Sequence, residues 1–211
     1  NDVAAMGTAA KAAGAELVSV ANNPIDLAWA DRPDQPAALV VPHEVKFAGV
    51  AHDEKRVQIG HDLKAEKLDA AVITSPASIA WAFNIRGGDV SCTPLPLGRA
   101  ILFADGSADL FLDEVKVSNA LRQHLGNSVT LRPLADLEKG LSDLKGKTVS
   151  VDPDVASAWF FDQLEQAGAT PVRQRDPVAL PKACKNDAEL AGSAAAHLRD
   201  GVALTRFLHW L

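Results

Sequence analysis

Several residue types are scarce in this 211-residue sequence, which has no tyrosine, one methionine, two cysteines and only 5% aromatic residues. The two cysteines, Cys92 and Cys184, fit neither a disulfide framework nor a CxxC metal site, so reduced thiols of a cytoplasmic protein are expected. Basic residues are outnumbered: 21 lysines and arginines against 27 acidic residues leave a net charge of −6, which argues against nucleic acid as a partner. The sequence also lacks an apolar run of about 18 residues, so we expect no membrane partner.

What remains has the composition of a globular protein, with 47% hydrophobic and 23% charged residues. A chain of this length buries roughly two-thirds of its unfolded surface and forms one domain, or one domain with a fragment of another. Mainly disordered, collagen-like and coiled-coil classes are therefore excluded.

The first fifty residues are predicted to be peripheral to the main domain. Residues 4–14 favour a short helix, and the apolar residues 17–20 favour a strand. Residues 21–49 show little periodicity and contain four prolines, which is typical of an inter-domain connector. We therefore assign residues 1–20 to the tail of a preceding domain, residues 21–49 to the connector, and residues 50–185 to the main domain.

Within the main domain, helix-like and strand-like segments alternate. Residues 51–67 are predicted to form an amphipathic helix. Its buried stripe is expected to contain Val57, His61, Lys64 and Leu68. Asp105-Gly106 joins two apolar segments in residues 99–112 and predicts an antiparallel hairpin. Further helices are expected from Ser75-Pro76 to Gly87-Gly88 and at 113–125, 134–145 and 152–167, with strands at 70–74, 128–131, 147–151 and 170–173.

These units predict an α/β fold with a mixed sheet flanked by helices, because hairpins are antiparallel whereas strand-helix-strand units favour parallel pairing. One long helix is predicted at the end of the chain. Asn186 and Glu189 have the spacing of a capping box, and an apolar stripe continues from Leu190 to Leu211. Since no stop residue follows this stripe, residues 186–211 are expected to be the start of a helix that leads into a further, absent domain.

No motif assigns a catalytic residue, a metal ligand or a cofactor site to this chain. The six histidines lack HExxH or cysteine-paired spacing, and there is no GxSxG nucleophile elbow. Gly87-Gly88 lacks the pattern of a phosphate-binding loop and is interpreted as a tight turn. A Ser-His-Asp triad assembled by the fold stays open, since all three residue types are available.

Arg86 and Asp89 flank this glycine pair and are the candidate substrate-binding residues. An arginine held on a rigid turn can bind a carboxylate or a peptide carbonyl through two parallel hydrogen bonds. The alternative is an internal Arg86–Asp89 ion pair that only shapes the turn. A second unusual segment contains Trp29 and Arg32. Trp29 is expected to fill a hydrophobic gap, with Arg32 paired to Asp31 or to a helix end, unless the segment has a functional role.

Three motifs resemble the large, three-domain Xaa-Pro aminopeptidases (aminopeptidase P). Residues 23–33 (NPIDLAWADRP) resemble the N-L-V-D-x-x-W-x-D-R-P linker of that family. Residues 78–90 (SIAWAFNIRGGDV) are similar to its E-I-A-W-L-F-N-L-R-G-S-D-V segment, and residues 182–211 to the segment that leads into its catalytic domain. The motifs occur in family order, with Gly88 in place of a common serine and Ala194 in place of a common arginine.

The resemblance implies a creatinase/prolidase N-terminal-like (ribonuclease H-like) fold for residues 50–185. It also implies that catalysis belongs to a following "pita-bread" domain, in which two divalent metal ions, usually manganese, activate the water that hydrolyses the Xaa-Pro bond. The ligands of those metals, two Asp, one His and two Glu, would lie beyond Leu211. On this interpretation the chain is a non-catalytic domain that walls the cleft for the peptide substrate and supports oligomer contacts such as a homodimer.

Two other functions are kept open. The chain can be a stand-alone partner-binding or dimerisation module of creatinase-like fold, or an independent small hydrolase. A natural stop codon after Leu211 would favour the module, and peptide turnover by this chain alone would favour the hydrolase.

Overall fold

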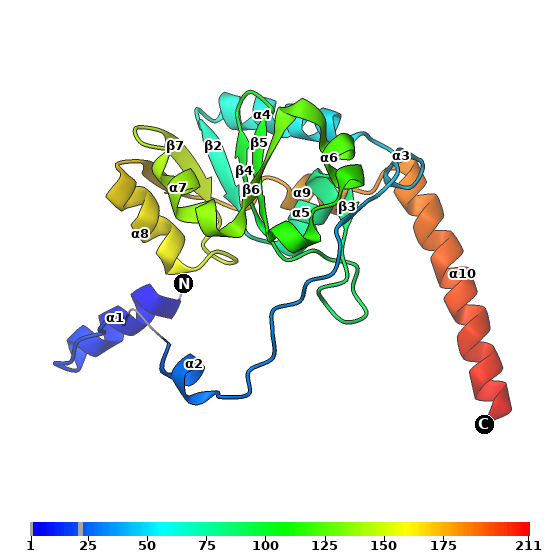
Figure 1. Cartoon of the computed structure of the whole chain (residues 1–211), viewed down its shortest axis with the longest axis horizontal. Helices are drawn as coiled ribbons and strands as arrows, with labels where there is room; N and C mark the ends of the chain where they lie inside the picture. The colour runs from blue at the N-terminus through cyan, green and yellow to red at the C-terminus, as the bar shows by residue number, and fades with distance from the viewer. Residues whose placement is uncertain (1, 21–22) are drawn as a thin grey trace.

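The computed structural model describes residues 2–20 and 23–211 (Figure 1). Its centre is a six-stranded mixed sheet with strand order β6-β5-β4-β2-β7-β8. The strands are β2 (Ala70–Ile73), β4 (Arg99–Phe103), β5 (Ala108–Leu112), β6 (Val129–Pro133), β7 (Thr148–Val151) and β8 (Thr170–Arg173). The predicted α/β fold with a mixed sheet flanked by helices is confirmed.

Parallel and antiparallel pairs occupy different parts of the sheet. β4 and β5 form the predicted antiparallel hairpin, and Gly106 in its turn has a φ of 85°, which favours glycine. The Asp105 carboxylate stabilises the same turn by accepting hydrogen bonds from the amide and the hydroxyl of Ser107. β2, β7 and β8 run parallel, as do β5 and β6, and β2 pairs antiparallel with β4.

Helices cover both faces of the sheet, and the alternating side chains of β2 identify which helix lies on which face. Ala71 and Ile73 pack in the cluster that contains residues of α4 (His52–Ala65), α5 (Pro76–Ala82) and α6 (Asn119–Leu125). Ala70 and Val72 pack on the other side with α7 (Leu137–Ser142) and α8 (Ala158–Ala167). Because both faces are covered, β2 is buried along its whole length.

The buried face of α4 differs from the predicted one. Val57, His61 and Lys64 are exposed, and the buried residues of the helix are Lys55, Arg56, Ile59, Gly60 and Leu63. The prediction was wrong because two cations of this helix find hydrogen-bond partners inside the protein, which a hydrophobicity pattern does not anticipate. Gly60 permits α4 to pack closely against the backbone at Ala104, because a Cβ at position 60 would lie only 2.9 Å from the Ala104 carbonyl oxygen.

Several predicted helices are shorter than expected because a new N-cap or a turn interrupts them. Residues 113–125 form the 3₁₀ turn η1 (Glu114–Lys116) and then α6, whose N-cap Ser118 accepts a hydrogen bond from the Leu121 amide. Residues 134–145 likewise divide into η3 (Leu134–Asp136) and α7. α8 begins only at Ala158, and the short elements η2 (Gly126–Ser128) and α9 (Ala179–Ala183) were not predicted.

A small two-stranded sheet lies beside the main one. β1 (Val41–Pro42) pairs antiparallel with β3 (Ile85–Arg86), and α3 (Val45–Ala48) follows β1. α5 therefore ends at Ala82, before the glycine pair that was predicted to stop it.

The first forty residues contain α1 (Asp2–Ala12) and α2 (Pro24–Ala28), and α1 confirms the predicted N-terminal helix. The strand predicted at 17–20 is wrong: these residues are exposed and form no regular element. Trp29 is 48% exposed and fills no gap. Arg32 pairs at 3.0 Å with Asp26 of α2 and not with the predicted Asp31.

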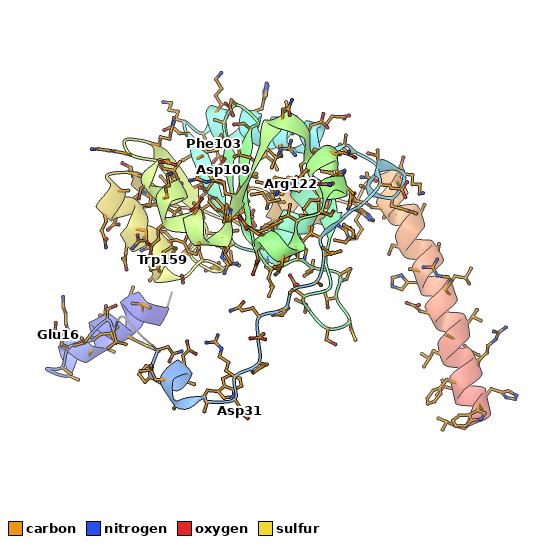
Figure 2. The ribbon with its side chains drawn as sticks, in the orientation of Figure 1. Glu16, Asp31, Phe103, Asp109, Arg122 and Trp159 are labelled. Carbon is orange, nitrogen blue, oxygen red and sulfur yellow. The ribbon has the colours of Figure 1, made fainter. Side chains whose placement is uncertain are left out.

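α10 (Asp187–Trp210) extends away from the sheet as one continuous helix (Figure 1). The predicted capping box is present, with the Asn186 side chain and the Glu189 side chain each bonded to the other residue's backbone N–H. None of its residues is buried, and beyond its first turn the side chains extend away from the rest of the domain (Figure 2). Leu198 and Trp210 are 71% and 78% exposed.

Candidate functional site

Arg86 lies in β3, where it pairs in register with Val41 of β1. Its Nη1 donates hydrogen bonds to the carbonyl of Ala80 at 3.2 Å and to that of Ile85 at 2.8 Å. The first of these carbonyls belongs to the last turns of α5, so the cation lies at the negative end of that helix. Burial lowers the pKa of Arg86, and the carboxylate of Glu189 opposes this shift.

Asp89 is removed from solvent, with a side-chain exposure of 0%. Its Oδ2 accepts hydrogen bonds from the Lys116 ammonium at 2.8 Å and from the Leu97 amide at 2.7 Å. The internal Arg86–Asp89 pair considered from the sequence is therefore wrong, because Lys116 takes the place of Arg86. The pair holds the loop that follows β3 against η1, and this position shields Asp89 from any ligand.

A pocket of about 300 Å³ lies beside Arg86. Its polar lining comes from four parts of the chain: His43 before α3, Lys55 of α4, Asn84 and Arg86 just before and in β3, and Glu189 of α10. Trp81 of α5 forms part of the apolar lining. Of these residues the sequence had singled out only Arg86, because the others are far apart in the chain.

Lys55 is a buried cation at the edge of this pocket, with 4% of its surface exposed. Its Nζ donates to Asn84 Oδ1 at 2.8 Å and to the Trp81 carbonyl at 3.3 Å, and lies 4.1 Å from the centre of the Trp81 ring. Burial lowers its pKa to about 8, against the opposing effect of Glu189. The ammonium is thus charged at neutral pH and held in one position.

Asn84 connects the elements around the pocket and was missed by the sequence reasoning. It adopts a φ of 47°, in the left-handed region that asparagine tolerates better than most residues. Its side-chain amide donates to the Val50 carbonyl at 2.9 Å, and its backbone carbonyl accepts from the His43 amide at 2.7 Å. An asparagine between a helix and a glycine pair is the one local signal that predicts such a turn.

Glu189 links the pocket to the start of α10. One carboxylate oxygen accepts from Trp81 Nε1 at 3.0 Å, while the other accepts from the Asn186 amide at 3.0 Å. Asn186 Nδ2 in turn donates to the Ala48 carbonyl at 2.9 Å. The direction in which α10 leaves the domain is therefore set by groups that also line the pocket.

The charges of the side chains around this pocket at pH 7 decide which groups it can bind. Burial and the nearby Arg86 lower the pKa of His43 below 6.5, so the imidazole is neutral at pH 7 and the pocket's charges are those of Lys55, Arg86 and Glu189. Two cations and one carboxylate can bind a group with acceptor oxygens, such as a peptide carbonyl or a carboxylate.

A metal-binding cluster and a membrane-spanning helix are both absent from residues 2–20 and 23–211. This part of the chain contains no group of three or more His, Cys, Asp or Glu side chains placed to hold a metal ion, so a dinuclear metal centre does not fit it. None of its helices is both long enough and apolar enough to span a bilayer.

Comparison with known proteins identifies the family. Residues 31–189 match the family described as Creatinase/Prolidase N-terminal domain. The chain belongs to this family. It is therefore a domain of the kind found in proteins of the Xaa-Pro aminopeptidase and prolidase families.

Relatives of this creatinase/prolidase domain are longer proteins. The chain is 33% identical over 228 residues to a "Probable Xaa-Pro aminopeptidase P" of Paracoccidioides brasiliensis, covering 100% of the chain and 36% of the relative. It is 37% identical over 212 residues to the protein of the same name from Coccidioides posadasii, covering 95% and 34%. The chain thus spans about a third of the length of these relatives.

A solved structure of a longer enzyme also contains a region that matches this whole chain. The X-prolyl aminopeptidase from Caenorhabditis elegans, described as a cytosolic enzyme with a di-nuclear active site, superposes with a TM-score of 0.88 and 28% identity. The match covers 100% of this chain and 35% of that enzyme.

Proposed function

We propose that this chain is the non-catalytic N-terminal or middle domain of a Xaa-Pro aminopeptidase, a metallopeptidase that releases an N-terminal residue ahead of proline. The observation that carries the proposal is the alignment of 95% or more of the chain with Xaa-Pro aminopeptidase P relatives of about three times its length. The two divalent metal ions, with manganese as the expected element, would then be bound by the rest of the parent enzyme.

The same proposal assigns the domain boundaries. We assign residues 1–20 to the tail of a preceding domain, residues 21–49 to a connector, residues 50–185 to the creatinase-like domain and residues 186–211 to the start of the helix that enters the catalytic domain. The exposure of α1, α2 and α10 supports this division, because such surfaces suit contacts with neighbouring domains. Cytoplasmic location is part of the proposal and is supported by two free, exposed cysteines.

In this enzyme the domain would wall the substrate cleft and contribute Arg86. Only Nη1 of Arg86 is bonded among the described residues, which leaves Nε and Nη2 available to a peptide carbonyl or carboxylate. Asp89 would act indirectly, since its buried pair with Lys116 fixes the turn that follows Arg86.

The test uses the longer protein that contains this chain. We expect it to release the first residue of a Xaa-Pro peptide, and Arg86→Lys to lower kcat/KM by about tenfold or more with an unchanged melting temperature, because lysine cannot form the paired bonds of a guanidinium. Arg99→Lys is the matched control, since Arg99 is also half-buried and bonded to a nearby carbonyl but does not line the pocket.

Two results would count against the proposal. A longer protein without Xaa-Pro aminopeptidase activity would contradict the assignment to that enzyme class. A lower melting temperature with normal kinetics in Arg86→Lys would assign Arg86 to the structure of α5 and β3 instead.

The alternative of a stand-alone dimerisation module is favoured by the apolar residues that α10 exposes. They are Leu190, Leu198, Val202, Leu204, Phe207, Leu208 and Trp210, followed by Leu211. In a longer enzyme these residues would meet a neighbouring domain or the second subunit of a homodimer. A stable dimer of this chain in sedimentation experiments, dissociated by Leu208→Glu, would favour the module.

A further inference from the structure

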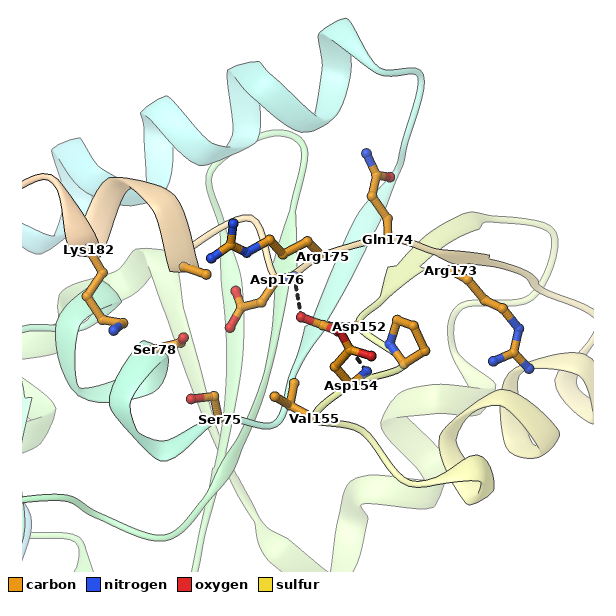
Figure 3. Close-up of a pocket in the computed structure, with 12 residues that line it drawn as sticks. Ser75, Ser78, Asp152, Asp154, Val155, Arg173, Gln174, Arg175, Asp176 and Lys182 are labelled. Atoms are coloured by element: carbon orange, nitrogen blue, oxygen red, sulfur yellow. Dashed lines mark hydrogen bonds between the residues drawn. The ribbon is translucent and has the colours of Figure 1, made fainter. Parts of the chain in front are cut away.

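A second pocket, of about 400 Å³, lies at the carboxyl ends of the three parallel strands β2, β7 and β8 (Figure 3). Ser75 follows β2, Asp152 follows β7, and Arg175 and Asp176 follow β8. This pocket is separate from the one beside Arg86, with which it shares no lining residue. Its volume is within the range of sites that hold small molecules.

The position of this pocket follows from the topology of the sheet. β2 and β7 are adjacent and parallel, but the chain leaves them toward opposite faces. β2 continues into α5, which packs with Ala71 and Ile73, whereas β7 continues toward α8, which packs with Ala70 and Val72. Connections that diverge in this way open a crevice at the carboxyl ends of the strands, which is where open α/β sheets bind ligands.

The floor of the crevice is a rigid polar frame. Asp152 is buried, and its carboxylate accepts hydrogen bonds from the amides of Asp154 at 2.9 Å and Asp176 at 2.8 Å. Asp176 is also buried and accepts a hydrogen bond from the Val178 amide at 2.8 Å. These two carboxylates are thus already occupied by donors of the protein, and they tie the loops after β7 and β8 together.

The cations at the mouth of the crevice are, by contrast, available. Within the described part of the chain, no carboxylate oxygen lies within 4.0 Å of the charged nitrogens of Arg173, Arg175 or Lys182. Arg173 packs over the Phe161 ring, 4.2 Å from its centre, on one side of the pocket. Figure 3 shows Arg175 and Lys182 on the other side: Lys182 extends toward Ser78, and Arg175 extends past the carboxylate of Asp176.

We propose that this crevice binds a small oxyanionic molecule, a carboxylate or a phosphate ester, between Arg175 and Lys182. The guanidinium offers paired donors and the ammonium a point charge, and Ser75 adds a hydroxyl at the end of β2. The Asp154 carboxylate at the centre of the crevice suits a hydroxyl or ammonium group elsewhere on the same ligand. The floor carboxylates do not repel the anion strongly, because each is neutralised in part by backbone amides.

The test is an NMR titration of the 211-residue chain with inorganic phosphate and, separately, with succinate, at constant ionic strength. We expect saturable shifts of the backbone amides of Ser75, Asp154 and Asp176 with at least one probe. Saturation with phosphate alone or with succinate alone supports the site and identifies the class of its ligand. The absence of saturable shifts at these amides with both probes would overturn the proposal.

Variants locate the binding. Arg175→Gln combined with Lys182→Gln should weaken the affinity by about tenfold or more, since two charge-assisted contacts are lost. Arg122→Gln, at an exposed position of α6, is the matched control and should leave the affinity unchanged. Unchanged affinity in the double variant, or equal weakening in the control, would contradict the site. Lys182→Gln alone answers the same question if the double variant is not folded by its circular dichroism.

Discussion

At the scale of single residues, charge is buried at several points of this domain, and each buried charge is held differently. Asp89 and Lys116 form an ion pair with side-chain exposures of 0% and 6%. Arg56 is 1% exposed and has no carboxylate partner among the residues that the structure describes. It is held by Ser128 Oγ, by the ring nitrogen and carbonyl of His52, and by the Phe83 ring. Such groups make the stability of the domain sensitive to single substitutions.

Lys116→Met should destabilise the chain by about 3 kcal/mol or more, because it leaves the Asp89 carboxylate buried without its cation. The control is Arg32→Met, which removes the exposed pair with Asp26 and should cost less than about 1 kcal/mol. Urea unfolding of both variants measures the difference. Equal losses of stability would show that the buried pair is no more important than the surface one.

His52 makes stability depend on pH in the weakly acidic range. Its Nδ1 faces the Arg56 guanidinium and its Nε2 faces the His124 carbonyl at 2.8 Å, so the neutral ring with hydrogen on Nε2 satisfies both contacts. Burial and the Arg56 charge lower its pKa from 6.5. The unfolded state therefore takes up a proton first as the pH falls below 6.5, and the native state loses stability in that range.

His52→Gln should flatten this loss, because an amide keeps one donor and one acceptor but does not titrate. The free energy of unfolding between pH 7 and about pH 5 is the measurement. His43, whose pKa is also lowered, acts in the same direction, so part of the slope should remain; the raised pKa of Asp176 acts in the opposite direction. His61→Gln on the exposed face of α4 is the control, and an identical slope in both variants would refute the role of His52.

At the scale of elements, α10 differs from every helix that covers the sheet. Its first turn is fixed by Asn186 and Glu189, while the rest makes no buried contact. A helix without tertiary packing is stabilised only by its own hydrogen bonds and propensity, and Gly201 in its interior costs about 1 kcal/mol relative to alanine. The C-terminal half of α10 is therefore expected to open readily.

Limited trypsin digestion should cut first after Arg199 or Arg206, because local opening exposes their peptide bonds. Gly201→Ala should slow this cleavage by stabilising the helix. Sites in the packed domain, such as Arg56, should resist until global unfolding. Complete protection of both α10 sites in a strictly monomeric sample would contradict the expectation.

At the scale of the whole molecule, the described residues make a folded domain that contains the two polar pockets described above and no group of three or more side chains placed to hold a metal ion. The two pockets lie at different places in the fold. One is at the junction with α10, where the chain leaves the domain, and the other is at the divergence of β2 and β7. On the two proposals above, the first pocket would contact a substrate in a larger enzyme, and the second would bind a small ligand of the domain itself.

The isolated chain should retain no stoichiometric manganese or zinc after dialysis and should not hydrolyse a Xaa-Pro peptide, because a dinuclear site needs several convergent carboxylates. Elemental analysis and a peptide assay with added manganese are the measurements. Tightly bound metal together with turnover by this chain alone would favour the independent hydrolase.

The sequence alone predicts much of the fold through local signals. Asp105-Gly106 predicts the hairpin, the apolar run at Ala70–Ile73 predicts a buried strand, and Asn186 with Glu189 predicts the start of α10. Each of these depends on contacts between residues close in the chain, which periodicity and capping rules capture. The family motifs add the class of protein in the same way, as short stretches of sequence.

Tertiary structure decided the rest. Lys55 and Arg56 are buried because Asn84, Ser128 and two aromatic rings from other elements surround them, so a pattern confined to α4 predicted the wrong face. Asp89 pairs with a lysine 27 positions away and not with its neighbour Arg86. The pockets likewise gather residues that are distant in sequence. Only the folded chain brings their charges together, because the contacts that stabilise this arrangement form between elements and no local pattern encodes them.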